Sequence, residues 1–185
     1  RLGTHEGRTD WLAGSEPLVD HLSDHERSLL TDWWLEVAAL EYASVASFSR
    51  FNLQLMSLGA PPELLMATQK ATMDEIEHTQ FAYRLASAYK GEEIGPAPFD
   101  LGDVTIETDP AQALHSLLEE ACVGEILGAA EAQVAAECAT DPVVKATYAR
   151  IADEEGQHAR LAWQSLQWML EQRPELRDQA AQWLD

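Results

Sequence analysis

Apolar residues recur every three to four positions over four long stretches of the chain, with polar residues between them. This spacing places the apolar side chains of each stretch on one face of an α-helix. Inward-facing and outward-facing positions can therefore be assigned along most of the sequence. The pattern predicts four helices, over residues 24–58, 61–90 or 62–90, 110–139 and 142–173.

Short sequence signals mark where these helices begin and end. Ser23-Asp24-His25-Glu26 is a capping box, in which the first and last residues each bind the backbone of the other. Asp109-Pro110 and Asp141-Pro142 each combine an N-cap side chain with proline at the first helical position. Gly59 and Gly91 stand where the first two helices must stop.

The segments outside the helices complete the predicted architecture. Residues 91–108 form a connection without helix, and their eighteen residues can cross the length of a helix of about 45 Å. We therefore expect an all-α, four-helix bundle made of two antiparallel helix pairs with a long crossover between them. Residues 1–23 are predicted to be an N-terminal extension, 24–173 the bundle, and 174–185 a short C-terminal cap helix.

Each predicted helix carries an acidic residue within its otherwise apolar face. The first and third helices carry a lone glutamate, and the second and fourth carry the motif Glu-x-x-His. The i, i+3 spacing of that motif puts its carboxylate and its imidazole on one helix face. The two halves of the chain thus repeat one plan, with six candidate residues: Glu41, Glu75, His78, Glu125, Glu155 and His158.

The four glutamates are expected to lie at the same height in the bundle. Counting residues from the helix ends at about 1.5 Å each places all four near the middle, within about one turn. Four buried carboxylates without cations would cost many kcal/mol, whereas two divalent ions would neutralise them. Carboxylate and imidazole ligands together suit iron or manganese, and also zinc. The pattern therefore predicts a pair of metal ions.

Longer motifs around these residues resemble a bacterial branch of the ferritin-like di-iron carboxylate superfamily, over residues 24–172. They read Glu-Tyr-Ala-Ser-Val-Ala-Ser-Phe at 41–48, Leu-Gly-Ala-Pro-Pro-Glu at 58–63 and Cys-Val-Gly-Glu at 122–125. Many relatives read Asp-Glu-x-Arg-His, whereas this chain has Glu77 and Gln157 at the arginine positions.

The resemblance implies a division of labour among the six residues. One metal would be held mainly by Glu41, Glu75 and His78, and the other mainly by the remaining three, Glu125, Glu155 and His158. Glu75 and Glu155 would bridge the two ions and serve as the catalytic carboxylates. The expected cofactor is a pair of iron ions (Fe2+/Fe3+), with manganese or a mixed Mn/Fe pair as alternatives and zinc as a substitute.

Four further residues are candidates for supporting the ligands. A metal-bound histidine usually donates its second N–H to a carboxylate, so Asp74 is expected to orient His158, and Glu154 to orient His78. The alternative is that both acids are simply exposed. Tyr148 is a candidate redox or hydrogen-bonding residue, and Cys122 lies one turn from a ligand. Both are also compatible with a plain role in the core.

Small side chains are expected to line one side of the ions, and they predict either a cavity for O2 or a small substrate or close helix packing. They are Thr68, Ala71, Thr72, Ala121, Cys122, Ala159 and Ala162. The opposite side is expected to hold larger groups: Trp34, Val37, Tyr148 and Ile151.

Composition narrows the classes of partner. A formal net charge of −20 disfavours binding to nucleic acid and to anionic membranes. It therefore also disfavours the function of the tRNA-modifying hydroxylases of the superfamily, which act on a nucleic acid. No apolar run approaches the roughly 20 residues that span a bilayer. The two cysteines, sixteen residues apart on one helix, cannot pair with each other. Free thiols favour a reducing compartment, and we expect a cytoplasmic protein.

Three functions remain open at this stage. The first is a non-haem di-iron oxidoreductase that uses O2 or peroxide on a small organic substrate with an external electron donor. The second is a ferroxidase or iron-handling protein, for which Fe2+ is the substrate and the acidic surface a funnel. The third is a metal-stabilised binding bundle without catalysis. A homodimer is compatible with all three.

Overall fold

The computed structural model describes residues 4–102 and 104–184, except the side chain of Leu184, and over this range the fold is all-α and bundle-like. Four long helical rods account for most of the fold. The third rod contains a π-helical segment, and a short 3-10 turn follows the fourth rod. The helices are α1 (Asp24–Leu58), α2 (Pro62–Lys90), α3 (Pro110–Ser116), the π-helix η1 (Leu117–Val123), α4 (Gly124–Cys138), α5 (Pro142–Gln172), the 3-10 turn η2 (Pro174–Leu176) and α6 (Arg177–Leu184).

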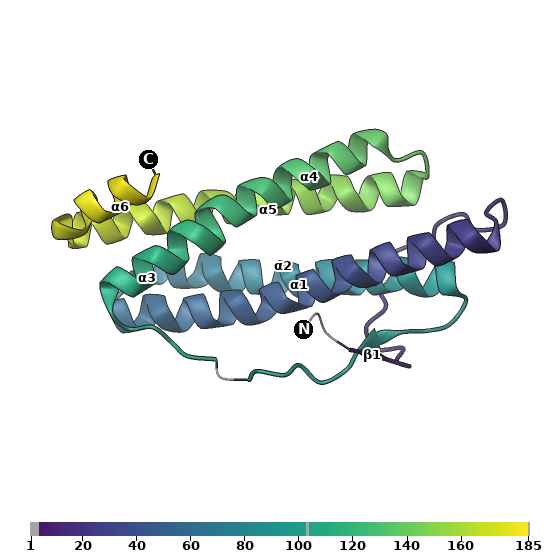
Figure 1. The fold of residues 1–185 in the computed structure, drawn as a ribbon, viewed down its shortest axis with the longest axis horizontal. Coiled ribbons are helices and arrows are strands. Elements are labelled where there is room, and N and C mark those ends of the chain that lie inside the picture. Colours follow the sequence, from purple (N-terminus) through teal and green to yellow (C-terminus); the bar gives the residue numbers. More distant parts are fainter. Residues whose placement is uncertain (1–3, 103, 185) are drawn as a thin grey trace.

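The rods are arranged as two packed pairs (Figure 1). Helix α1 packs along α2, and α4 packs along α5. The connection from Lys90 to Pro110 runs the length of the molecule, so α2 and the α3–η1–α4 rod point in the same direction (Figure 1). The two pairs meet mainly where α2 contacts α5. The long crossover expected from residues 91–108 is therefore observed.

The helix ends lie at the positions that their capping signals predicted. Ser23 accepts a hydrogen bond from the backbone N–H of Glu26, whose side chain in turn accepts one from the backbone of Ser23. Gly59 and Gly91 end α1 and α2 in the left-handed conformation, with φ of 79° and 77°, which residues with a Cβ adopt at a cost.

The third rod is not the single α-helix expected over residues 110–139. Its residues Leu117–Val123 form a π-helix, in which each N–H bonds the carbonyl five residues back. The wider turn inserts one extra residue and changes which side chains face inward beyond it. Nothing in the sequence of this segment, Leu-Leu-Glu-Glu-Ala-Cys-Val, distinguishes it from an ordinary α-helix. Glu125 lies directly after this segment.

The N-terminal extension packs on the bundle, and it also forms a short pairing that the sequence did not predict. His5–Glu6 (β1) pairs antiparallel with Gly95–Pro96 (β2) of the crossover. Farther along, Leu12, Val19 and Leu22 pack against the apolar cluster that contains Trp34. The extension and the crossover therefore contact each other through this strand pairing, on the outside of the α1–α2 pair.

Asp141 links the extension to the fourth rod, which leads to a prediction about stability. Its carboxylate caps α5 through the N–H groups of Val143 and Val144, and it also accepts the N–H of Leu18. Asp109 caps α3 in the same way, but its carboxylate binds no other segment of the described chain. We expect Asp141→Ala to lower the free energy of unfolding by about 1–2 kcal/mol, and by more than Asp109→Ala, in urea titrations. Equal losses in the two variants would show that the Leu18 contact adds nothing.

Apolar clusters fill both ends of the bundle and leave its middle to polar groups. One cluster, around Leu114, Leu166 and Met169, also packs against Leu176 and Ala180 of the C-terminal segment. The second, around Trp34 and Tyr83, fills the opposite end. Buried carboxylates and imidazoles lie between them. In the described part of the chain, no helix combines the length and the apolar character needed to cross a bilayer.

Candidate metal centre

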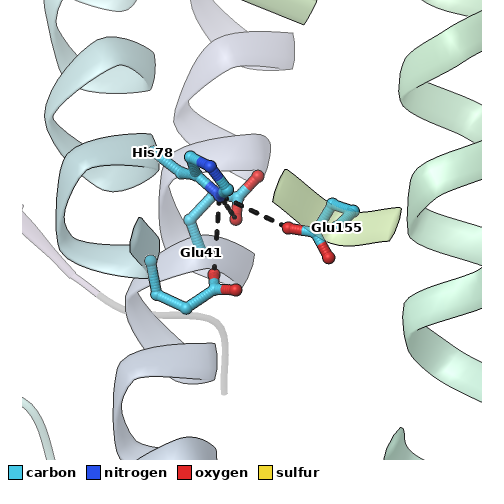
Figure 2. A group of neighbouring side chains, drawn as sticks. Glu41, His78 and Glu155 are labelled. Atoms are coloured by element: carbon cyan, nitrogen blue, oxygen red, sulfur yellow. Dashed lines mark ion pairs between the residues drawn. The ribbon is translucent and has the colours of Figure 1, made fainter. Parts of the chain in front are cut away.

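The six candidate ligands come from all four rods and converge in the polar middle. Figure 2 shows three of them, Glu41 from α1, His78 from α2 and Glu155 from α5, with their polar ends pointing toward one another. Glu75 is 1% exposed and His78 is fully buried, so neither can reach bulk water. The set is completed by Glu75 on α2, Glu125 on α4 and His158 on α5.

The carboxylates gather around the Nδ1 atom of each histidine. His78 Nδ1 lies 3.3 Å from Glu155 Oε1, 3.5 Å from Glu41 Oε2 and 3.9 Å from Glu75 Oε2. His158 Nδ1 lies 3.1 Å from Glu75 Oε1 and 3.6 Å from both Glu125 Oε2 and Glu155 Oε2. Each histidine thus forms, with three carboxylates, a group whose ligand atoms lie within 4.8 Å of one another and could hold one metal ion.

Glu75 and Glu155 belong to both groups. Each directs one carboxylate oxygen toward His78 Nδ1 and the other toward His158 Nδ1. Glu41 and Glu125 each belong to one group only. The arrangement is that of two adjacent sites that share two carboxylates.

Unpartnered atoms test whether a metal pair fits this cluster. Both oxygens of Glu75 and the Nδ1 atoms of His78 and His158 are buried without a hydrogen-bond partner among the described residues. Leaving four such atoms unsatisfied would cost several kcal/mol. Cations bound between them would satisfy all four, so the residues present fit two metal ions.

The Nε2 atom of each histidine, which faces away from the cluster, contacts an acid from the facing helix. His78 on α2 contacts an acid of α5, and His158 on α5 contacts an acid of α2. Glu154 Oε2 lies 2.8 Å from His78 Nε2, and Asp74 Oδ2 lies 3.3 Å from His158 Nε2. These are the contacts that the motif spacing predicted. An Nε2–H that donates to a carboxylate leaves Nδ1 as the lone-pair nitrogen, facing the cluster.

Two basic residues that were not predicted from the sequence form hydrogen bonds with the carboxylates of Asp74 and Glu154. Lys70 lies 2.7 Å from Asp74 Oδ2, and Arg150 Nε donates to Glu154 Oε1 at 3.2 Å. Each base stands five residues before the glutamate of its Glu-x-x-His motif, so the repeat itself carried the signal. Arg150 also pairs with Glu77. The residue that replaces the arginine of the related motif thus binds an arginine from the facing helix.

Without metal, the cluster holds protons. Burial lowers the pKa of His78, but its contacts with Glu155 and Glu41 outweigh burial and raise the pKa to about 11. Contacts with the carboxylates likewise outweigh burial at His158 and raise its pKa to about 12. Burial raises the pKa of Glu75 well above its ordinary value and that of Glu125 to about 7, whereas close contacts with both histidines and with Glu125 lower the pKa of Glu155 despite its burial.

The other two candidate residues lie near the centre in ordinary packing roles. Tyr148 stacks against Trp34, with ring centroids 4.8 Å apart, and its hydroxyl accepts a hydrogen bond from Trp33 at 2.7 Å. Cys122 is buried, which raises the pKa of its thiol to about 11, and it belongs to neither ligand group.

The larger opening beside the centre lies on the side opposite to the one where a cavity was expected. A groove of about 800 Å³ between α1 and α4 is lined by Val37, Tyr148 and Ile151 and reaches Glu41, Glu125 and Glu155. On the small-residue side, Thr68, Cys122 and Ala162 are buried in close packing. A hollow of about 320 Å³ beside Ala71 and His158 remains there, and it is lined by neither Thr68 nor Cys122.

Comparisons with known proteins do not assign the chain to a family. No protein-family model, no curated protein and no solved structure matches it. The interpretation of the centre therefore depends on its own geometry.

Proposed function

We propose that the chain is a ferritin-like four-helix bundle whose central cluster holds two iron ions and acts as a non-haem oxidoreductase on O2 or peroxide. Glu41 and His78 would complete one site, and Glu125 and His158 the other, with Glu75 and Glu155 shared. Manganese, alone or paired with iron, fits the same donors, and zinc would occupy them without redox chemistry.

The observation that carries the proposal is the sharing of two buried carboxylates between two histidines. Glu75 is 1% exposed, and its oxygens lie 3.9 Å from His78 Nδ1 and 3.1 Å from His158 Nδ1, with no other partner among the described residues. Two histidines on opposite sides of two carboxylates are what a pair of adjacent cations requires.

The chain's own groups would prepare the site for oxidation chemistry. A bound di-iron pair would supply two electrons for the reduction of O2. Glu154 and Asp74 hold the two imidazoles with Nδ1 facing inward. Burial of Glu75, His78 and His158 excludes water from one side, while the groove beside Glu41 and Glu125 leaves the other accessible. An external donor would return the electrons after each turnover.

Anaerobic loading with Fe2+ followed by mixing with O2 tests the proposal. We expect about two irons per chain, O2 consumption that stops once these are oxidised, and renewed consumption when a reductant is added. Zinc-loaded protein is the control and should consume no O2. Continued O2 uptake with excess Fe2+ and accumulation of iron would instead indicate an iron-handling protein. An iron-loaded chain that consumes no O2 would contradict oxidoreductase activity.

Removing an outer acid should weaken metal binding without removing a ligand. In Glu154→Ala, His78 Nε2 loses its 2.8 Å contact, and the imidazole is no longer held in one orientation. We expect metal affinity to fall by about 10- to 100-fold, measured by competition with a chromophoric chelator. Asp153→Ala changes an exposed neighbouring carboxylate that, among the described residues, accepts a side-chain hydrogen bond only from Gln157, and it should leave the affinity unchanged. Equal effects of the two changes would show that Glu154 acts through charge alone.

A further inference from the structure

Helix α4 is apolar on two opposite faces. On one face Ala132 and Ala136 are buried. On the other, Leu127, Ala130 and Val134 recur at i, i+3 and i+7 and form an exposed row. Leu127 and Val134 are each more than half exposed. A helix that is apolar all round is normally buried on every side, so the outer face of α4 has the composition of a covered surface.

Helix α1 carries a second exposed apolar row. Leu29, Trp33 and Leu40 share one helix face, and each is more than half exposed. Helices α1 and α4 lie on the same side of the molecule, with α2 and α5 behind them (Figure 1). Trp33, Leu40 and Val134 also line the groove between α1 and α4. The two rows and the groove therefore form one apolar surface, called here the α1–α4 face, and a contiguous surface of this kind marks an interaction site.

The extent of the α1–α4 face indicates the size of its partner. Leu29 and Leu40 lie about 16 Å apart along α1. Leu127 is not among the residues that line the groove, so a small molecule bound in the groove would leave it exposed. An occupant that covers both rows must lie along the groove and extend over α4. A helix placed lengthwise between α1 and α4 meets this requirement, because rows of side chains at i, i+3 and i+4 interlock with those of another helix.

Charge restricts the partner further. Residues 28–49 of α1 and 117–138 of the third rod contain no basic residue. They carry four exposed acids on or beside the α1–α4 face: Asp32, Glu36, Glu131 and Glu137. Two bound metal ions would offset only the four glutamates of the buried cluster, so these surface acids keep their charge. A second copy of the chain, with the same acids and a net charge of −20, would be repelled, as would an anionic membrane. A basic partner would be attracted.

We propose that the α1–α4 face binds a basic amphipathic helix of another protein. The apolar side of that helix would lie against the two rows, and its basic side chains would lie near the four surface acids. This interaction goes beyond the function proposed above, because it requires no metal. The groove also reaches Glu41, Glu125 and Glu155, so a bound helix would cover the accessible side of the cluster.

Calorimetric titration of the full chain, with and without zinc, tests the proposal. The probe is a peptide of leucine and lysine, about four helical turns long, whose leucines share one helix face. One comparator has the same composition with the leucines dispersed around the helix, and a second has glutamate in place of each lysine. We expect one probe to bind per chain, at least about tenfold more tightly than either comparator, and its affinity to fall with added salt.

Two pairs of substitutions test whether the apolar rows carry the binding. Leu127→Ser combined with Val134→Ser should weaken binding of the probe by at least about tenfold, because two apolar side chains lose their cover. Met66→Ser combined with Met73→Ser changes two residues of α2 that are more exposed still, and it should leave the affinity unchanged. Equal losses in the two double variants would overturn the proposal.

Charge reversal tests the role of the surface acids. Glu131→Lys combined with Glu137→Lys should weaken binding of the probe and reduce its dependence on salt. Glu93→Lys combined with Glu171→Lys changes the net charge by the same amount at exposed positions outside the α1–α4 face, and it should weaken binding less. Equal effects would show that the probe responds only to the total charge of the chain, which would contradict the proposal.

Tryptophan fluorescence locates the bound probe. Burial of the exposed Trp33 should shift the emission to shorter wavelength, and the shift should be lost in Trp33→Phe and kept in Trp163→Phe. The proposal fails if the probe does not bind, if the dispersed comparator binds equally well, or if Trp33→Phe keeps the shift. It also fails if the chain self-associates in sedimentation and the Leu127→Ser, Val134→Ser variant is monomeric, because the face would then join copies. Probe binding by a chain that takes up no metal would support this interface and contradict only the oxidoreductase.

Discussion

Replacing either shared carboxylate by alanine is expected to empty the whole centre. In Glu75→Ala or Glu155→Ala, each of the two ligand groups loses one of its three carboxylates, and the two ions would lose one of the two carboxylates that they share. The remaining like-charged ions would then face each other with less negative charge between them. We expect less than one tenth of the original metal content by elemental analysis, and O2 consumption at the level of the buffer.

Replacing a carboxylate that serves one group should have half that effect. Glu41→Ala removes an oxygen near His78 only, and Glu125→Ala removes one near His158 only. Each variant is therefore expected to retain about one ion per chain. Glu171→Ala, at an exposed position on α5, is the control and should keep both. If Glu75→Ala retained one ion, Glu75 would belong to a single site and the shared-carboxylate geometry would be wrong.

The metal-free protein is expected to become less stable as the pH rises from 5 to 9. Unfolded glutamate and histidine side chains titrate near 4.5 and 6.5. In the folded chain the pKa of Glu125 is about 7, that of His78 about 11 and that of His158 about 12, while that of Glu75 is raised well above 4.5. Over this range the folded state binds more protons than the unfolded state, so stability falls with rising pH. The lowered pKa of Glu155 acts only below this window.

Bound metal should remove this loss of stability with rising pH, because the cations take the place of the protons. At pH 7 binding should release at least two protons per chain, one each from His78 and His158, and metal affinity should rise with pH. Thermal unfolding followed by circular dichroism from pH 5 to 9 should show Tm falling by roughly 10 °C with a chelator and remaining nearly level with Zn2+. Glu125→Gln should flatten the fall between pH 5 and 7. A metal-free Tm that rises across this range would contradict the proton-holding cluster.

Local signals explain why the helices could be predicted so closely from the sequence. The capping box at Ser23, the Asp-Pro starts at Asp109 and Asp141, and the glycines Gly59 and Gly91 each act within one turn of chain. Their effect does not depend on distant contacts. The six candidate ligands follow from the same local periodicity, because only helix register and equal height are needed to bring them together.

Several features that depend on distant contacts were not predicted. The π-helix Leu117–Val123 is built from ordinary helix-forming residues and arises where η1 packs on α5. The β1–β2 pairing joins segments about ninety residues apart. The position of the groove depends on how far α1 and α4 are separated, which side-chain size alone does not decide. The bases Lys70 and Arg150 could have been found, because both stand at the same offset in the repeat.

The pairing of the rods has a consequence for assembly. Glu41, Glu75 and His78 belong to one helical hairpin, and Glu125, Glu155 and His158 belong to the other, yet each proposed ion needs oxygens from both. The cations would therefore hold together two hairpins whose covalent link is the crossover from Lys90 to Pro110. A chain cleaved by a protease within that crossover should stay associated while metal is bound and dissociate when a chelator removes the metal.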